Sequence, residues 1–410
     1  MKGLLLISLL FVSAFLPIQK EPVFFKIEND FGVVDYNADT IARPEKLKSF
    51  FIKLDDLKTG KIKKVSILHI GDSHIQADWI TGRLRNHFQK EFGNAGRGLI
   101  FPARAARSNE SFSFISSASG TWESKRAVFP DQPLPIGIGG ITLNTADSAA
   151  SIKIEVRQLD GINPYHQKLT FFYRKDPLSY FLNVRDSADR TVATIGPYTK
   201  EESTDISTVY LNQPTRLFSL QVEKTLPHQQ RFTLYGINLE NENSGILYHS
   251  IGVNGAKVKH YMVAEHFMEQ TRQLQPDLIL ISLGTNESLE QQERDPNFED
   301  HLNKMALAFH HLHSGVPIIF ITPPGNFKNR TKKNPATEEI ISALIRFTDA
   351  HQLPLLNLYE AGGGKHFATS WSKKRLLQED GVHFTRTGYE LQGDMIYLAL
   401  INAYNRHAEF

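Results

Sequence analysis

Short apolar runs alternate with helical patterns in two separate parts of the chain. Residues 65–70 form a mostly apolar run that ends at Gly71, and Ile80, Leu84 and Phe88 follow at the spacing of one helical face. After residue 245 the same alternation returns, with strand-like runs at residues 277–282, 316–321 and 355–358. Strands alternate with helices in this way when a parallel sheet is covered on both faces. The pattern therefore predicts an α/β fold with a parallel sheet flanked by helices.

The middle of the chain has a different period. Ile152 and Ile154 alternate with charged residues, and similar alternation recurs between frequent Gly, Pro, Asn and Asp residues. A period of two is typical of an antiparallel sandwich or jelly roll. We therefore expect an inserted all-β, jelly-roll-like domain at residues 109–242. It is either a structural insertion or a carbohydrate-binding module, in which exposed aromatic residues such as Trp122 or Tyr165 could stack on sugar rings.

The first residues predict an export signal. Lys2 supplies a positive charge, and residues 3–17 are apolar apart from two serines. The run is too short to span a bilayer comfortably but suits the apolar core of a secretory signal. We expect residues 1–20 to be a signal segment and the protein to be periplasmic or secreted; a retained membrane anchor is the alternative. Residues 21–108 and 243–410 would then form one discontinuous domain around the insertion.

Composition narrows the classes of function. Hydrophobic residues make up 41% of the 410 positions and charged residues 22%, which is ordinary for a globular protein. The absence of cysteine excludes disulfides, thiolate metal sites and a cysteine nucleophile. The formal net charge of +2 gives no electrostatic reason to expect nucleic acid as a partner.

Two short motifs follow predicted strands. The sequence GDSH places Ser73 after the first apolar run and before a helix, at the carboxyl end of the sheet, where ligands bind in such folds. Ser73 is a candidate nucleophile, although Asp72 or Ser73 could instead simply cap the helix. We expect Asp72 to hold the serine turn and His74 to be structural. The sequence GTNE places Asn286 where its amide could donate to a bound oxygen; a turn is the alternative.

Two further motifs lie in the second half of the chain. In DGVHFT, Asp380 precedes His383 by three residues, so its carboxylate can accept a hydrogen bond from Nδ1–H and leave Nε2 free as a base. The alternative is a loop in which Thr385 caps the last helix. In NGA, Gly255 allows the backbone to approach a ligand closely, and an ordinary turn is the alternative. Together the motifs supply a nucleophile, a base with an orienting acid, and oxyanion donors.

In order and setting these motifs resemble the SGNH (GDSL-type) hydrolases, whose four blocks carry Ser, Gly, Asn and His. The corresponding residues here are Ser73, Gly255, Asn286 and His383. The segments IGDSHIQAD, FGNAGRGLIFP and SIGVNGA look like those of bacterial peptidoglycan O-acetylesterases, which carry a carbohydrate-binding-like β module between the first two blocks. The resemblance implies an SGNH-hydrolase-like parallel sheet with the β module at the predicted insertion.

The resemblance also implies acyl transfer through an acetyl-serine. His383, oriented by Asp380, would remove the Ser73 proton, while the N–H groups of Ser73 and Gly255 and the Asn286 side chain would hold the oxyanion. No metal or cofactor is expected. The implied activity is removal of O-acetyl groups from an acetylated cell-wall polysaccharide, with peptidoglycan preferred. The alternatives are an O-acetyltransferase that acts on a sugar acceptor and a non-catalytic glycan-binding protein.

Overall fold

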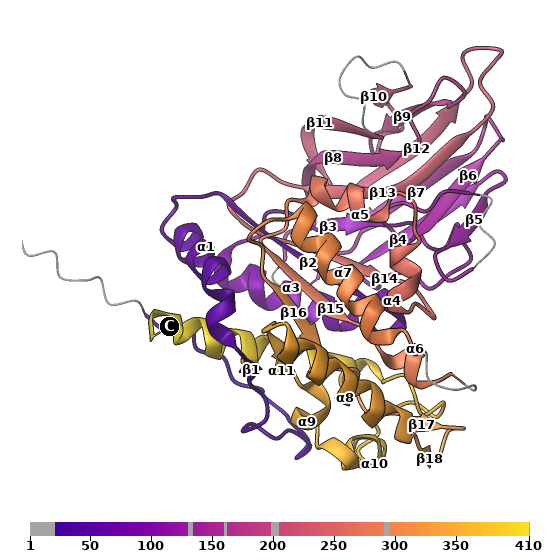
Figure 1. The fold of residues 1–410 in the computed structure, drawn as a ribbon. Helices are drawn as coiled ribbons and strands as arrows, with labels where there is room; N and C mark the ends of the chain where they lie inside the picture. Colours follow the sequence, from indigo (N-terminus) through magenta and orange to yellow (C-terminus); the bar gives the residue numbers. More distant parts are fainter. Residues whose placement is uncertain (1–20, 130–133, 160–161, 198–204, 291–295, 410) are drawn as a thin grey trace, which may run out of the picture.

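The computed structural model describes the chain from residue 21 to residue 409, with short gaps. The described ranges are 21–129, 134–159, 162–197, 205–290 and 296–409. The predicted signal segment, residues 1–20, lies outside them. Figure 1 shows two parts, a sheet covered by helices and a block of antiparallel strands beside it.

A six-stranded sheet forms the α/β part. Its order is β1-β19-β16-β15-β2-β14. Neighbouring strands run parallel except the pair β1 and β19. The strands are β1 (Ile41–Ala42), β2 (Lys64–Gly71), β14 (Gly245–Gly252), β15 (Leu278–Ser282), β16 (Ile318–Ile321) and β19 (Leu355–Leu356). The predicted α/β fold with a parallel sheet is therefore confirmed.

Helices cover both faces of this sheet because its strands carry apolar side chains on both sides. Val65 and Ile67 of β2 belong to one buried cluster, and Leu68 and Ile70 belong to the other. On the first face lie α1 (Lys48–Lys58), α3 (Trp79–Phe92) and α11 (Arg386–Asn405). On the second lie α4 (Val258–Met262), α5 (Phe267–Thr271), α7 (Phe298–Leu312) and α8 (Pro335–Ala350). Shorter helices are α2 (Ser73–Gln76), α6 (Thr285–Ser288), α9 (Leu358–Ala361) and α10 (Phe367–Lys373).

Antiparallel strands form the second part. One sheet has the order β10-β9-β12-β7-β4, and the other has the order β11-β8-β13-β6-β5 with β3 paired to β13. Their bounds are β3 (Gly98–Ile100), β4 (Phe114–Ser119), β5 (Glu123–Arg126), β6 (Ile141–Thr145), β7 (Ser151–Val156), β8 (His166–Tyr173), β9 (Phe181–Arg185), β10 (Thr191–Ile195), β11 (Ile206–Thr215), β12 (Leu217–Glu223) and β13 (Phe232–Glu240). In β7, Ile152 and Ile154 are buried and Lys153 is exposed, as the period of two predicts. Since β3 begins at Gly98, antiparallel pairing starts before residue 109, and the predicted domain boundaries stay predictions.

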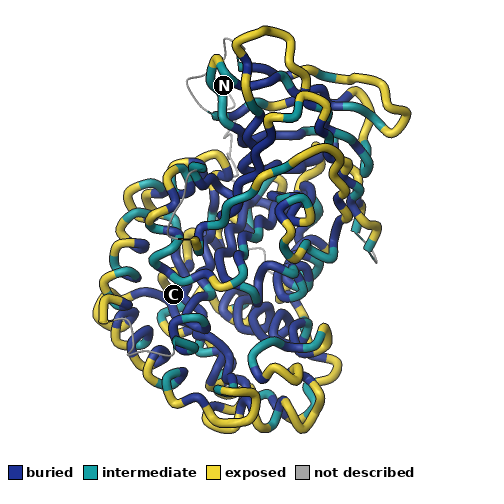
Figure 2. Tube along the Cα trace, turned by 90° about the vertical axis from the view of Figure 1, so that its right-hand side faces the viewer, coloured by how far each residue is buried: buried dark blue, intermediate teal, exposed yellow. Residues whose placement is uncertain are grey.

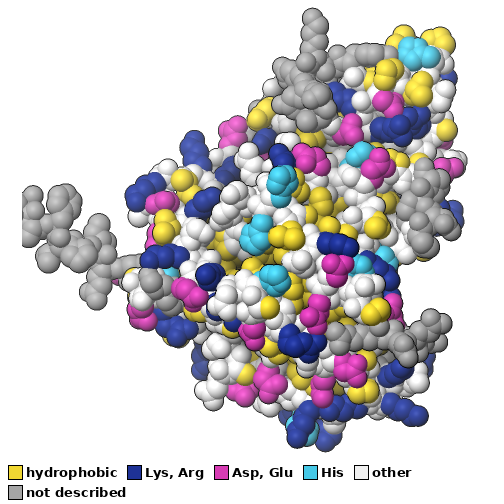
Figure 3. Space-filling model, viewed as in Figure 1, with side chains coloured by type: hydrophobic (Ala, Val, Ile, Leu, Met, Phe, Trp, Pro, Cys, Tyr) yellow, Lys and Arg dark blue, Asp and Glu magenta, His cyan; other side chains and the backbone are white. Residues whose placement is uncertain are grey.

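Charges of both signs are mixed on the face of the molecule drawn in Figure 3. Figure 2 shows buried backbone running through both parts, with exposed positions on outer helix faces and loop tips. On the face drawn in Figure 3, Lys and Arg side chains are interspersed with Asp and Glu, in keeping with the small net charge. Among the described residues, every helix is either too short or too polar to cross a bilayer.

The register of three central strands brings distant loops together. Gly71 at the end of β2 pairs with Gly252 at the end of β14 and with Ser282 at the end of β15. The loops that follow these residues carry Ser73, Gly255 and Asn286. Because parallel strands end at one edge of a sheet, the three loops meet there.

Candidate active site

Ser73 is the first residue of α2, directly after the buried strand β2. Asp72 is the N-cap of this helix, and its Oδ1 accepts a hydrogen bond from the His74 N–H at 3.0 Å. Aspartate is a favourable N-cap because its carboxylate satisfies an N–H that has no partner within the helix. The expected role of Asp72 in holding the serine turn thus has a direct geometric basis, and the Ser73 side chain is left for another partner.

That partner is His383. Its Nε2 lies 2.9 Å from the Ser73 Oγ, and its Nδ1 lies 2.7 Å from Oδ2 of Asp380. The other carboxylate oxygen of Asp380 accepts the N–H groups of Val382 and His383, each at 2.9 Å. Residues 310 positions apart in the chain therefore form one hydrogen-bonded series, Asp380–His383–Ser73. This is the arrangement in which an imidazole can take a proton from a serine hydroxyl.

The Asp380 carboxyl is held in its ionised form. Partial burial alone would raise its pKa, but the hydrogen bonds from the Val382 N–H, the His383 side chain and the His383 N–H outweigh burial and hold the pKa below the usual value. The side chains of His383 and Asp380 are 39% and 45% exposed. An ionised carboxylate bonded to Nδ1 leaves Nε2 as the ring nitrogen that faces Ser73.

Asn286 and Gly255 reach the same place from two other loops. Asn286 lies in α6 after β15, and its Nδ2 donates to the carbonyl oxygen of Ala256 at 2.9 Å and, more weakly, to Oδ2 of Asp72 at 3.4 Å. Gly255 has a φ of +81°, which favours glycine because a side chain would be strained there. The Asn286 amide therefore joins the loop of Ser73 to the loop of Gly255. Its donation to an oxyanion stays a prediction, because its N–H groups face protein acceptors in this structure.

The sequence patterns do not predict a role for Gln76, which forms hydrogen bonds to residues of these loops. Gln76 is buried, with 7% of its surface exposed. Its Nε2 donates to Ser108 Oγ and to the carbonyl oxygen of Asn109, both at 2.7 Å, and its Oε1 accepts the Asn254 N–H at 2.5 Å. The side chain thus connects the helix of Ser73, the residue before Gly255 and the segment that leads into the antiparallel strands. A glutamine three positions after Ser73 gives no sign of these distant contacts.

A buried ionic cluster lies next to the C-terminal end of α2. Asp78 lies between α2 and α3, and its Oδ2 is 2.6 Å from Arg85 Nη2 and 2.8 Å from Arg97 Nη2. Ser250 of β14 donates to its Oδ1 at 3.2 Å, and Ser111 donates to its Oδ2 at 2.8 Å. Burial alone would raise the pKa of Asp78, but the two arginines outweigh it and hold the pKa far below the usual value. The cluster joins the parallel sheet to the first residues of the antiparallel part.

Three other titratable groups beside Ser73 are buried. Burial raises the pKa of Asp72 to about 7 and that of Glu287 to about 7. Burial lowers the pKa of His74 to about 3, and its Nδ1 lies 2.9 Å from the Tyr389 hydroxyl. The His74 ring lies 5.6 Å from that of His383 and is neutral at ordinary pH, which fits the structural role expected for it.

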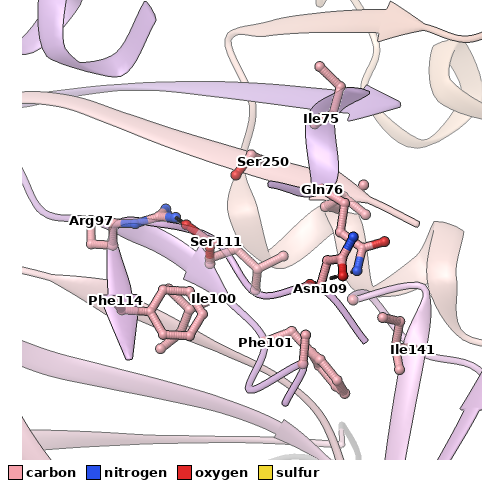
Figure 4. A pocket seen from close by; sticks show the side chains of 15 residues that line it. Ile75, Gln76, Arg97, Ile100, Phe101, Asn109, Ser111, Phe114, Ile141 and Ser250 are labelled. Atoms are coloured by element: carbon pink, nitrogen blue, oxygen red, sulfur yellow. Dashed lines mark hydrogen bonds between the residues drawn. The ribbon is translucent and has the colours of Figure 1, made fainter. Parts of the chain in front are cut away.

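A small, partly open pocket lies beside α2, with Ile75 and Gln76 of that helix in its lining. Figure 4 shows Gln76, Arg97, Asn109 and Ser111 around it, and Ser73 and His383 are not part of its lining. Its volume is about 50 Å³. That is room for one or two water molecules and not for a sugar ring. The pocket therefore belongs to the support of α2. In the described part of the chain, no three His, Asp or Glu side chains are grouped so that they could hold a metal ion.

Comparisons with known proteins give one family match and several structural matches. A model of the GDSL-like Lipase/Acylhydrolase family matches residues 228–391, a range that contains Gly255, Asn286, Asp380 and His383 but not Ser73. A solved structure of a peptidoglycan O-acetylesterase is similar with a TM-score of 0.73 and 22% sequence identity, over 89% of this chain and 99% of that one. No curated protein matches the chain.

Two other solved structures are similar over a smaller part. A lipase/acylhydrolase from Enterococcus faecalis has 24% identity and a TM-score of 0.30, over 39% of this chain and 77% of its own. A variant of an acetylxylan esterase from Geobacillus stearothermophilus has 17% identity and a TM-score of 0.30, over 41% and 74% of the two chains. The similarity to the peptidoglycan O-acetylesterase, in contrast, extends over 89% of this chain and so includes antiparallel strands.

Proposed function

We propose that this chain is an SGNH (GDSL-type) acylhydrolase and that it removes O-acetyl groups from a cell-wall polysaccharide, with peptidoglycan as the preferred substrate. The observation that carries the proposal is the series Asp380–His383–Ser73, with separations of 2.7 Å and 2.9 Å. The fold shared with a peptidoglycan O-acetylesterase supports the choice of polymer. The apolar run at residues 3–17 supports a periplasmic or secreted location, where such a polymer is met.

In the proposed reaction, the Ser73 Oγ attacks the acetyl carbonyl carbon while His383 Nε2 accepts the hydroxyl proton. The carbonyl oxygen becomes an oxyanion, held by the N–H groups of Ser73 and Gly255 and by the Asn286 amide. One such donor typically stabilises the transition state by about 3 kcal/mol. To bind this oxygen, the Asn286 amide turns from the Ala256 carbonyl, its acceptor in this structure.

The protonated His383 then gives its proton to the sugar oxygen, and the C–O bond to the acetyl carbon breaks. A water molecule, deprotonated by His383, attacks the acetyl-serine, and acetate leaves with Ser73 restored. Ionised Asp380 stabilises the imidazolium in both steps. The series needs no metal for any of these transfers.

Exposure of the base favours hydrolysis over acetyl transfer to a sugar. The His383 side chain is 39% exposed, so the proposed base is open to solvent water. An acetyltransferase needs the acceptor sugar to displace that water. We therefore expect acetate as the main product even when an acceptor sugar is present.

The test compares the purified protein with its Ser73→Ala variant on three esters: O-acetylated peptidoglycan, acetylated xylan and 4-nitrophenyl acetate. We expect the parent to release acetate fastest from peptidoglycan and the variant to be about 10⁴-fold slower on all three. Equal acetate release by parent and variant would show that Ser73 is not the nucleophile. A preference for xylan would move the proposal to another polysaccharide, and acetylated acceptor sugar as the main product would make the protein a transferase.

A further inference from the structure

An open pocket lies in the antiparallel part, between the segment that joins β3 to β4 and strand β5. Its volume is about 530 Å³, and its lining includes Arg107, Trp122, Glu123, Ser124 and Lys125. Arg107 lies in the segment between β3 and β4, and the other four residues lie in or next to β5. The pocket has the size of a site for one or two sugar rings, unlike the small pocket beside α2.

Short contacts connect this pocket to the candidate active site. Ser108, which follows Arg107, accepts a hydrogen bond from Gln76 on the helix of Ser73. The Ser124 hydroxyl donates to the carbonyl oxygen of Ala106 at 3.3 Å, which fixes β5 against the same segment. The pocket walls are therefore fastened to the helix that holds the nucleophile.

The chain beyond β5 leads from the pocket to the oxyanion loop. Val128 Cγ1 lies 3.9 Å from the position that a Cβ on Gly255 would occupy. Only Arg126 and Ala127 lie in sequence between Lys125, which lines the pocket, and Val128, which approaches Gly255. The pocket and the loop of Gly255 are therefore close along this strand.

Trp122 gives the pocket an aromatic wall. The indole is half-buried against the core, and its N–H donates to the carbonyl oxygen of Ser119 at 3.0 Å. This bond fixes the ring and uses its one polar group, so the ring contributes an apolar face. Sugar rings stack on such faces through their C–H groups.

Among the described residues that line the pocket, Arg107 and Lys125 are cations and Glu123 is the acid. Two cations face one acid, Glu123, and no ion pair joins Arg107 or Lys125 to a carboxylate in the described part of the chain. Arg107 also has a φ of +51°, an unfavourable conformation for a residue with a side chain. Such conformations occur preferentially at ligand sites, where the surrounding structure maintains them. An exposed arginine held in this way suits a carboxylate, which its guanidinium can bind with two parallel hydrogen bonds.

We infer that this pocket binds a carboxylate-bearing sugar of the polymer, next to the sugar from which the acetyl group is removed. The inference rests on the proposed function, since it names a substrate subsite for the same reaction. Trp122 stacks on the sugar ring, and Arg107 and Lys125 bind its carboxylate. The subsite selects acidic polysaccharides over neutral ones.

Binding is tested first without turnover, in the Ser73→Ala protein. The probes are the disaccharide of N-acetylglucosamine and N-acetylmuramic acid and, as a neutral match of the same size, chitobiose. Titration calorimetry should show roughly tenfold tighter binding of the acidic disaccharide, and Arg107→Ala should remove that preference. Trp122→Ala should weaken both disaccharides. Equal affinity for the two probes, or a preference that survives Arg107→Ala, overturns the inference.

Turnover is tested in the protein with Ser73 present. Arg107→Ala and Trp122→Ala should lower the ratio of activity on O-acetylated peptidoglycan to activity on 4-nitrophenyl acetate about tenfold, mainly through KM, since the subsite binds substrate and transition state alike. The controls are Lys224→Ala and Tyr210→Ala, which remove an exposed cation and a 67% exposed ring elsewhere on the antiparallel part.

The controls should keep the parent ratio. If all four variants keep it, the subsite is wrong although the esterase stands. If the parent releases acetate from neither ester, the proposed function is wrong, and the binding experiment still decides whether the pocket takes an acidic sugar.

Discussion

The two halves of the Ser73–His383 pair are held in place by different means. On the nucleophile side, Asp72, His74 and Gln76 are 1%, 4% and 7% exposed, and their partners come from distant parts of the chain. On the base side, His383 and Asp380 are 39% and 45% exposed, and their orienting bonds join residues two or three positions apart. Buried tertiary contacts position Ser73, whereas a short surface loop positions His383.

This difference separates activity from stability. An exposed pair contributes little to folding because water solvates its groups in the unfolded chain as well. A buried ionic or hydrogen-bonded group is costly to disrupt because its partners remain buried without compensation. Substitutions on the base side should therefore reduce rate with little loss of stability, and substitutions on the nucleophile side should affect stability as well.

The largest expected effect is that of His383→Ala. Removal of the base should lower kcat about 10⁴-fold, equivalent to about 5 kcal/mol of barrier. The free energy of unfolding should change by less than about 1 kcal/mol, because the side chain is partly exposed and its bonds are local. Steady-state kinetics and urea denaturation of the same preparation measure both quantities. A large loss of stability would contradict the division between the two sides.

Asp78→Asn should mainly reduce stability, in contrast to His383→Ala. The substitution leaves Arg85 and Arg97 buried without a countercharge, and we expect it to lower the free energy of unfolding by about 3–5 kcal/mol. Asp380→Asn is the matched substitution on the base side, where the change in stability should stay below about 1 kcal/mol. Urea denaturation of the two variants compares them directly. Similar losses in both would show that the exposed loop is as tightly coupled to the fold as the buried cluster.

Gln76→Leu should lower both kcat and the free energy of unfolding, each by less than the substitutions above. The substitution removes the hydrogen bonds from the helix of Ser73 to Asn254 and to Asn109. The loop that carries Gly255, the proposed oxyanion loop, therefore loses its attachment to that helix. We expect kcat to fall about 30-fold, equivalent to about 2 kcal/mol, with KM changed less than about twofold.

Gln89→Leu is the control for loss of a buried glutamine. The Gln89 side chain donates to the carbonyl oxygens of Gly96 and Ile246, and it is 4% exposed. Both variants should lose similar amounts of thermal stability, but Gln89→Leu should keep the parent kcat. If the two variants lose kcat equally, Gln76 acts through general stability and not through the position of the oxyanion loop.

Local sequence patterns could predict the base side and the fold class. The spacing of Asp380 and His383 is enough to predict their hydrogen bond, because residues three positions apart in a turn lie within hydrogen-bond reach. Buried runs such as residues 65–70 have no polar face, which already requires cover on both sides of the sheet.

The support of the nucleophile could not be predicted in this way. Gln76 meets Asn254 across 178 positions, and Asp78 meets Ser250 across 172 positions. Such contacts depend on the register between β2 and β14, which a single sequence does not specify. The motif match predicts which residues are brought together, and the contacts that hold them emerge only with the fold.

The comparison extends to pH through the buried imidazole of His69. Burial lowers the pKa of His69 to about 3, and both ring nitrogens are occupied by the hydroxyl groups of Tyr248 and Ser282, at 2.8 Å and 2.7 Å. Between pH 6.5, the ordinary pKa of the unfolded chain's histidine, and pH 3, the unfolded chain binds a proton that the folded chain excludes. Stability therefore falls as the pH drops through this range, by up to about 1.4 kcal/mol per pH unit for each such group.

In His69→Gln this contribution disappears, so a plot of the free energy of unfolding against pH from 7 to 4.5 should be shallower than that of the parent, whatever the loss of stability at pH 7. Equal slopes for the parent and His69→Gln would mean that water reaches β2 in the folded state, and the sharp division between a buried nucleophile side and an exposed base side would not hold.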